Sequence, residues 1–298
     1  VDRYECFRRI FSEMEEAGVP ANLQFADPHF EFVFDPEYVE KLTQEFSCIR
    51  TYTITENRFE HYSKFNVPRY AIPAEVRYTV DIIHLAAKYG KHLVIPLQDL
   101  KWMHIGADRM NRPLREALEL YGKYVIPVNE HIGPRHIQRQ TSVWGFWLAG
   151  LVEHWGVEPQ SWWYENARMI EPGIFGQREP NNTRIMPPDL YRAMILLGAG
   201  MGATVYDFEP FWDLFDYDNS VCWRRFIYPT LMEVIQRRLI PNREQVLEKT
   251  KVAYQYPEVN DITEFHEILR DVDWIGDQGL LSRAAYGLWE RYLEHELI

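Results

Sequence analysis

Residues 91–130, KHLVIPLQDLKWMHIGADRMNRPLREALELYGKYVIPVNE, contain the pattern that decides the fold. Two short runs rich in Val and Ile, at 91–98 and 123–129, have the composition of buried β-strands. Between them, residues 112–121 carry apolar side chains at helical spacing. A strand, a helix and a second strand in this order are typical of a parallel β-α-β unit. The stretch therefore predicts an α/β fold with a parallel sheet.

The same alternation continues on both sides of this stretch. Further strands are predicted at 21–26, 48–55, 161–165 and 203–209, and further helices at 2–17, 36–46, 74–89, 142–154, 187–199 and 220–238. Repeats of roughly 30 to 40 residues are typical of a (β/α)8 TIM-type barrel. No GxGxxG loop follows a strand, and the glycines of LGAGMGAT are expected to end a helix and form a turn.

The predicted barrel is incomplete, because a helix opens the chain and only six strands are evident. We expect the first strand to be missing from this chain, and an eighth to lie at 251–256 or within 58–73. No Pro/Gly/Ser-rich linker marks a second domain. We therefore expect one domain over 1–298, in which 257–298 form a C-terminal helical extension, with no separate β-sandwich.

The composition is that of a globular protein with an excess of aromatic residues. Hydrophobic residues make up 46% and charged residues 26%, but aromatic residues reach 15%, with 10 Trp and 18 Tyr. Rings beyond those that a core needs often line a surface that stacks on sugars or bases. A net charge of −12 argues against a nucleic-acid or anionic-membrane partner. No apolar run is long enough to span a bilayer, and no secretory signal precedes the first helix.

The three cysteines are widely separated in the sequence. Cys6, Cys48 and Cys222 match no metal-binding spacing, so we interpret them as buried thiols.

Each of the six predicted strands ends at an acidic residue. These residues are Asp27, Glu56, Asp99, Glu130, Glu165 and Glu209. The carboxyl ends of the strands of a parallel barrel lie on one face, which holds the active site in such enzymes. Aspartate is common in turns but glutamate is not, so four glutamates favour a shared acidic cleft. Glu165 also follows three rings in SWWYE, which would give a flat apolar surface beside a carboxylate.

An acidic cleft lined with aromatic rings suits glycoside hydrolysis. One carboxyl group donates a proton to the leaving oxygen, and another activates water or attacks the sugar. Motifs for zinc, calcium, phosphate or a serine nucleophile are not found, so we expect neither a metal nor a cofactor. Two alternatives stay open: a non-catalytic carbohydrate-binding protein on the same barrel, and a metal-dependent sugar isomerase or lyase.

Three stretches carry a resemblance to a known family: GFWLAGLVEHWGVEPQSWWYENA at 145–167, GATVYDFEPFWDLFD at 202–216 and RRFIYPTLMEVIQRRLIPNREQVLEKTKVAYQ at 224–255. With weaker matches at 53–59 and 126–133, they resemble the catalytic domain of glycoside hydrolase family 98. The resemblance implies a (β/α)8 barrel, usually followed by a β-sandwich, and endo-acting, inverting hydrolysis without a metal. The implied activities are endo-β-1,4-galactosidase on blood-group glycans and endo-β-1,4-xylanase on decorated xylan.

The resemblance also implies catalytic roles. Glu56 in TEN would be the general acid, and Glu165 in WWYEN would belong to the pair that activates water. The partner of Glu165 falls on Glu130 in VNE, with Asp99 in LQD as the rival. The family pattern has an aspartate in this role, so Glu130 would be a departure from it.

Residues around these acids are candidates for contacts with the sugar. They are Asn57, Arg58, Trp102, Asn129, His131, Trp162, Trp163, Asn166, Glu209 and Trp212. The expected partner is thus a polysaccharide or oligosaccharide substrate, and no nucleic-acid, membrane or protein partner is expected. We favour decorated xylan, because a compact chain without an accessory domain suits a polymer-degrading enzyme. A secreted or cell-surface location follows from this substrate class alone.

Overall fold

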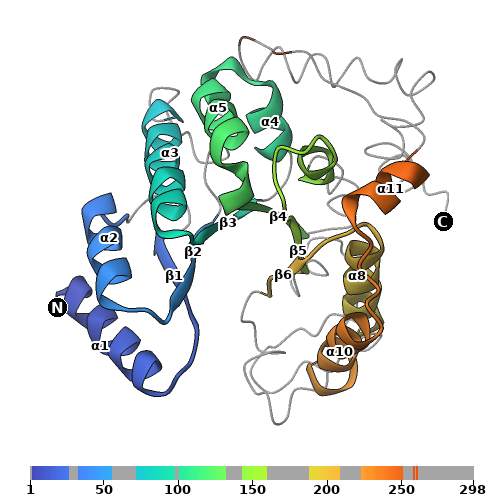
Figure 1. Cartoon of the computed structure of the whole chain (residues 1–298), viewed down its shortest axis with the longest axis horizontal. Coiled ribbons are helices and arrows are strands. Elements are labelled where there is room, and N and C mark those ends of the chain that lie inside the picture. Colours follow the sequence, from blue (N-terminus) through green and yellow to red (C-terminus); the bar gives the residue numbers. More distant parts are fainter. Residues whose placement is uncertain are drawn as a thin grey trace, which may run out of the picture.

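Six parallel strands form one sheet in chain order, β1-β2-β3-β4-β5-β6. The computed structural model describes residues 2–26, 33–55, 72–97, 101–131, 143–159, 188–208, 223–250, 258 and 260. The strands are β1 (Ala21–Ala26), β2 (Ile49–Ile54), β3 (His92–Leu97), β4 (Val125–His131), β5 (Gly156–Pro159) and β6 (Val205–Tyr206). The sheet is curved, and the helices lie along its outer side (Figure 1). The predicted α/β fold with a parallel sheet is confirmed, with six strands rather than eight in the described part of the chain.

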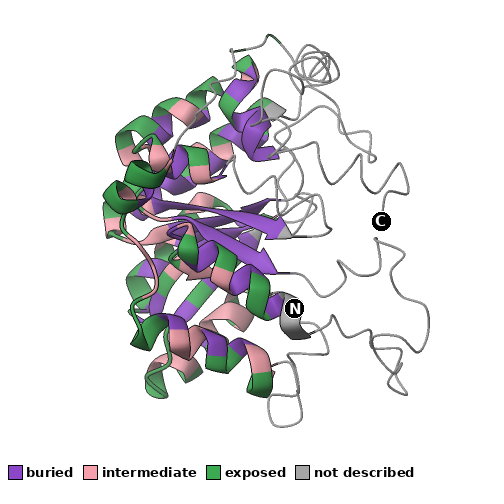
Figure 2. Ribbon diagram, turned by 90° about the vertical axis from the view of Figure 1, so that its right-hand side faces the viewer, coloured by how far each residue is buried: buried purple, intermediate pink, exposed green. Residues whose placement is uncertain are grey.

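The helices alternate with the strands, as in repeated β-α units. They are α1 (Arg3–Glu16), α2 (Pro36–Glu45), α3 (Ile72–Tyr89), α4 (Lys101–Ala107), α5 (Arg112–Tyr121), α8 (Pro188–Gly200), α10 (Tyr228–Gln236) and α11 (Arg243–Lys249), with the short turns η3 (Arg109–Asn111), η4 (Gly122–Tyr124) and η5 (Trp223–Ile227). Residues 143–148 are also helical. Figure 2 shows buried strands at the centre and exposed residues on the helices. No helix in the described residues is long and apolar enough to cross a membrane.

Local sequence signals explain where several helices begin and end. The side chain of Asp35 accepts a hydrogen bond from the amide of Glu37 at the start of α2, where Pro36 occupies the first turn. Asn242 and Gln245 form a reciprocal capping box at the start of α11. As predicted from LGAGMGAT, α8 ends at Gly200, and Gly202 follows with φ of +94°, a conformation that favours glycine.

Two corrections concern the fifth strand and the helix before it. The strand lies at Gly156–Pro159, earlier than the predicted strand at 161–165, which falls outside the described residues. The helix predicted at 142–154 is shorter in the structure, where its last helical residue is 148. Gly150 then adopts φ of +78° in the turn that leads to β5. Helix α4 was not predicted, since it is short and directly precedes α5.

Alternate residues of the strands face two different environments. On the outer side of the sheet, Leu93, Ile95 and Leu97 pack with the helices in the main core. On the inner side, Val94, Ile126 and Val128 form a separate cluster, against which Val205 packs. On β1 and β2 the inner side is polar, because Asn22 exchanges hydrogen bonds with Thr51 and Thr53. The inner side is therefore polar on β1 and β2 and apolar where Val94, Ile126, Val128 and Val205 meet.

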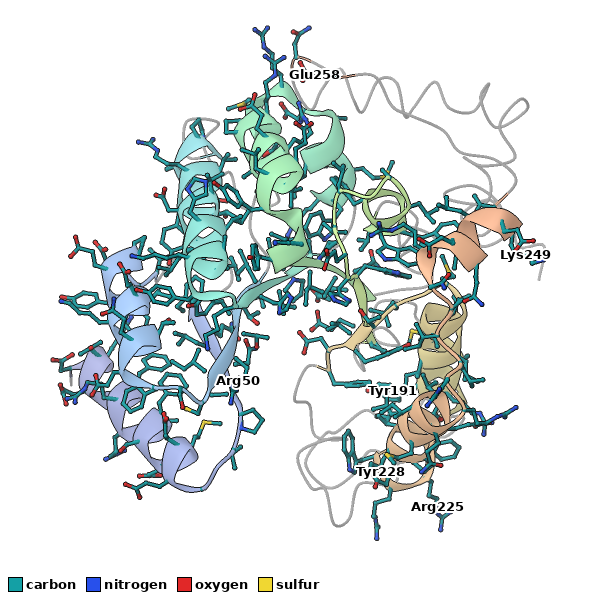
Figure 3. The ribbon with its side chains drawn as sticks, viewed as in Figure 1. Arg50, Tyr191, Arg225, Tyr228, Lys249 and Glu258 are labelled. Carbon is teal, nitrogen blue, oxygen red and sulfur yellow. The ribbon has the colours of Figure 1, made fainter. Side chains whose placement is uncertain are left out.

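A second core lies beyond the sheet, between α8, η5 and α10. It contains Tyr191, Met194, Ile195, Ala199, Ile227 and Val234. Figure 3 labels Tyr191 on α8 and Tyr228 at the start of the neighbouring helix α10. At the opposite side of the sheet, Glu258 forms ion pairs with Arg112 and Arg115 of α5. These pairs place Glu258 beside α5 (Figure 3). The other residues of 257–298, apart from residue 260, lie outside the described part.

The predicted burial of the cysteines holds for one of them. Cys48 is buried with 6% of its surface exposed, whereas Cys6 is only partly buried, and both are free thiols. Cys222 lies outside the described residues.

The first prediction concerns the close approach of β5 and β6 at Gly156. A Cβ atom at Gly156 would lie 2.7 Å from the carbonyl oxygen of Val205 and 3.0 Å from Cγ2 of Val128. We expect Gly156→Ala to lower the free energy of unfolding by about 1–3 kcal/mol, because backbone atoms would have to move. Urea unfolding measures this loss.

Gly145→Ala is the matched control for this substitution. Gly145 is helical and exposed, and among the described residues no atom lies within 4 Å of its added Cβ. We expect this variant to gain up to about 1 kcal/mol, since alanine is the better helix former. Equal unfolding midpoints for the two variants would contradict the close packing at Gly156.

Candidate active site

Glu130 is a buried carboxylate at the carboxyl end of β4. Only 3% of its surface is exposed. It follows Ile126 and Val128 at alternate positions of the strand, and both of these belong to the inner cluster. Glu130 therefore lies on the inner face, at the edge where the carboxyl ends of the strands meet.

Glu158 of β5 is the direct neighbour of Glu130 across the sheet. The two residues are register partners in the parallel pair β4 and β5, and Glu158 has 6% of its surface exposed. Adjacent strands lie about 4.8 Å apart, and paired residues of a parallel sheet point to the same face. Two buried carboxyl groups thus stand side by side at the inner face.

The sequence analysis missed Glu158, although the residue was present in the quoted stretch. Because the aromatic run SWWYE has high β-propensity, the fifth strand was predicted there, and GVEP, with Gly and Pro, had the composition of a turn. Glu158 nevertheless fits the pattern of the other predicted strands, because it is an acid near the carboxyl end of a strand.

Asp207, the residue that follows β6, adds a third carboxyl group at this end of the sheet. Its amide donates to the carbonyl oxygen of Val157 at 3.0 Å, which continues the β5–β6 ladder past Tyr206. Burial raises the pKa of the Asp207 carboxyl above its usual value, and a hydrogen bond from the amide of Phe208 at 3.0 Å acts in the opposite direction. The sequence analysis took Glu209 as the acid at the end of this strand and did not select Asp207.

Three carboxyl groups on neighbouring strands can support acid–base chemistry. A group that keeps its proton can donate it, and an ionised group can accept a proton from water. The apolar side chains of Val128 and Val205 lie directly behind them on the same face. A low-dielectric surrounding of this kind strengthens the interactions of each carboxyl group with its neighbours.

Most of the predicted site residues fall outside the described part of the chain. They are Glu56, Asn57, Arg58, Asp99, Trp162, Trp163, Glu165, Asn166, Glu209 and Trp212. Glu56 directly follows Thr55, the residue after the last residue of β2. His131 is the last residue of β4 and is the register partner of Pro159. These assignments stay predictions.

Trp102 and Asn129 lie away from the inner face, contrary to the prediction that they contact sugar. Trp102 is 2% exposed, donates from Nε1 to the carbonyl oxygen of Val128 at 3.0 Å, and packs edge-on against Phe146. A ring that stacks on a sugar needs an open face, and this ring is part of the core. Asn129 is 1% exposed and is paired with Leu97, so it lies on the helix-facing side of β4.

The amino-terminal edge of the sheet carries a pair of histidines. The rings of His92 and His154 lie edge to face with centroids 5.9 Å apart, and Nδ1 of His154 is 3.0 Å from Oγ1 of Thr204. Burial, followed by the charge of His154, lowers the pKa of His92, and Glu153 acts in the opposite direction. In parallel barrels this edge contributes to stability rather than to catalysis.

The second prediction follows from the lowered pKa of His92. The folded state takes up this proton less readily than the unfolded state, so stability falls as the pH drops below the unfolded value of about 6.5. We expect His92→Gln to lose less stability than the wild type between about pH 7.5 and about pH 5.5. Urea midpoints at the two pH values measure the difference. His84→Gln, on the exposed face of α3, is the control, and a wild-type slope in His92→Gln would refute the prediction.

Groups of three or more metal-ligating side chains are not found among the described residues.

Comparisons with known proteins place these observations in a family. The family model for glycosyl hydrolase family 98 matches residues 4–241 of the chain. None of the curated proteins compared with the chain matches it.

Solved structures with a similar fold include three of the catalytic module of a family 98 glycoside hydrolase from Streptococcus pneumoniae TIGR4. The native form has a TM-score of 0.65 at 22% identity. The complexes with the H-disaccharide and the LewisY pentasaccharide blood group antigens have TM-scores of 0.64 at 22% identity and 0.67 at 21% identity. Each match covers 84% of this chain and 43% of the other, so this chain spans less than half the length of these relatives. At this identity the likeness supports the shared fold.

Proposed function

The chain belongs to glycosyl hydrolase family 98, and from this premise we propose that it is an endo-acting hydrolase of internal β-1,4 bonds in a complex glycan. The reaction inverts the anomeric centre and needs no metal. The observation that carries the proposal is the buried pair of Glu130 and Glu158 on adjacent strands of the matched region. We also propose that the six strands belong to a closed (β/α)8 barrel, because they are parallel, consecutive and curved.

In the proposed mechanism, water is activated by the pair that includes Glu130. Its partner is Glu158, by virtue of their register. The family resemblance instead suggests Glu165 as one member of the pair, with Glu130 as its partner and Asp99 as the rival of Glu130. The pair holds the water, accepts its proton and directs its oxygen to the anomeric carbon. As the water attacks one face of the sugar ring, the leaving oxygen departs from the opposite face.

Glu56 is proposed as the general acid that protonates the leaving oxygen. It begins the segment after β2, two strands away from Glu130. In an inverting enzyme the acid and base carboxyl groups stand about 6.5–9.5 Å apart, which leaves room for the water. Separation of this order suits side chains that converge from strands that are not adjacent.

Two classes of substrate are proposed for the same site. Decorated xylan is the class that the sequence analysis favours. Blood-group glycans are the class bound by two of the similar solved structures. Both contain β-linked sugars with branches, and both lie outside cells, so we propose a secreted or cell-surface location.

Digestion of a glycan panel tests the proposed function. The panel contains arabinoxylan, glucuronoxylan, A- and B-type oligosaccharides and LewisY pentasaccharide, and fragment masses show which bonds are cut. We expect internal cleavage of one class, unchanged by EDTA. Binding without cleavage would instead favour a carbohydrate-binding protein, and loss of activity in EDTA would favour a metal-dependent sugar isomerase or lyase.

A further inference from the structure

Asp207 occupies a defined position in the sheet, although it follows the last residue of β6. Gly156 pairs with Val205 and Val157 pairs with Tyr206. The hydrogen bond from the amide of Asp207 to the carbonyl oxygen of Val157 continues this register by one residue. Asp207 and Glu158 are the next residues of the two chains after the pair of Val157 and Tyr206, so they lie beside each other, and Glu158 is the register partner of Glu130.

Strand alternation places the Asp207 side chain on the inner face. Val205, two residues earlier, packs against the inner cluster, whereas Tyr206 packs against the helix-side cores. Among the described residues, Glu130, Glu158 and Asp207 are the acids at neighbouring strand positions at this end of the inner face. Each carboxyl group comes from a different strand, and Glu158 is the central one.

This arrangement sets an electrostatic requirement on the central carboxylate. If all three groups were ionised, the two outer charges would both repel Glu158 across spacings of about 5 Å. A proton on an outer group removes one of these repulsions and converts that group into a hydrogen-bond donor. One oxygen of Asp207 already accepts from the amide of Phe208, so the other oxygen can carry the proton.

Building on the proposed function, we propose that Asp207 is a positioning residue whose protonated carboxyl donates a hydrogen bond to Glu158 and thereby orients Glu158 toward the substrate water. Asp207 does not touch the reacting atoms. The burial that raises the pKa of Asp207 supports this role, because burial disfavours the charged carboxylate relative to the protonated form.

Two substitutions separate donation of a hydrogen bond from simple packing. Asp207→Asn keeps a donor of similar shape without a charge that titrates, whereas Asp207→Leu removes the donor. At about pH 6 we expect the Asn variant to keep kcat within about threefold of the wild type, and the Leu variant to lose roughly 10- to 100-fold. Asp81→Asn, an exposed position on α3, is the matched control.

The dependence of kcat on pH distinguishes the two roles, because a purely structural role of Asp207 would not alter it. In the wild type, activity falls on the alkaline side as Asp207 loses its proton, and in Asp207→Asn this fall moves to higher pH. An Asn variant with the wild-type alkaline limb would overturn the proposal. So would a Leu variant that is as active as the Asn variant.

A direct titration separates failure of this inference from failure of the proposed function. Carbon-detected NMR follows the ionisation of Asp207 in the wild type and in Glu158→Gln, with no substrate present. We expect the titration midpoint of Asp207 to move when Glu158 is replaced, because the two groups are coupled. An unchanged midpoint would refute the contact even if the glycans are cleaved, and a moved midpoint would support it even if none is cleaved.

Discussion

Glu130→Gln is expected to lower kcat for glycan hydrolysis by roughly 10²- to 10⁴-fold, with little change in KM. The amide keeps the size of the side chain but cannot accept the proton of the attacking water. Because Glu130 is 3% exposed on the inner face beside Glu158, its loss acts on the transition state rather than on general affinity. Initial rates on the substrate identified by the glycan panel measure the effect.

Glu119→Gln is the matched control, since this glutamate is exposed on the outer side of α5. We expect wild-type kcat for it, and thermal unfolding verifies that both variants are folded. A Glu130→Gln variant that is folded and retains wild-type kcat would remove Glu130 from the mechanism.

The partner of Glu130 is identified by comparing Glu158→Gln with Glu165→Gln, and Asp99→Asn tests whether Asp99 takes the place of Glu130 beside Glu165. Residues that act as a unit show strongly non-additive effects, so a double variant is scarcely slower than the slower single variant. We expect this behaviour for Glu130 and Glu158. If Glu165 shows it instead, together with Glu130 or with Asp99, the register of β4 and β5 does not identify the catalytic pair.

Glu56→Ala is expected to show the second large effect, and its size depends on the leaving group. With a natural glycan, loss of the general acid lowers kcat by roughly 10²- to 10⁴-fold, because a sugar hydroxyl leaves poorly without a proton. With an aryl glycoside of the same oligosaccharide, we expect a much smaller loss, since a nitrophenolate leaves without protonation. Equal slowing of both substrates would show that Glu56 is not the acid.

The sheet could be predicted from the sequence because its strands have strong local signals. β3 and β4 are runs of Val, Ile and Leu next to helices with clear periodicity, so their order and parallel pairing followed from the pattern. β5 was harder to predict, because a four-residue strand with Gly156 and Pro159 is stabilised by its neighbours rather than by its own propensity.

The candidate site could be predicted only in part, for a related reason. The sequence identified Glu130 because it ends a clear strand. Strands buried on both faces lack the alternation that distinguishes inner from outer side chains, so Asn129 was assigned to the site although it faces the helices. Trp102 was assigned to the site because the sequence does not distinguish a ring in the core from a ring that binds sugar. Glu158 and Asp207 became evident only from the register of β4, β5 and β6.

The most direct test of the central claim is a time course of proton NMR spectra during digestion by the wild type and by Glu130→Gln. If carboxyl groups at this edge of the sheet activate water, digestion by the wild type produces new reducing ends. These ends appear first as the α-anomer from a β-linked glycan, and they are nearly absent with the variant. Release of the β-anomer first would contradict inversion. Equal release by both proteins would contradict the assignment of catalysis to this edge of the sheet.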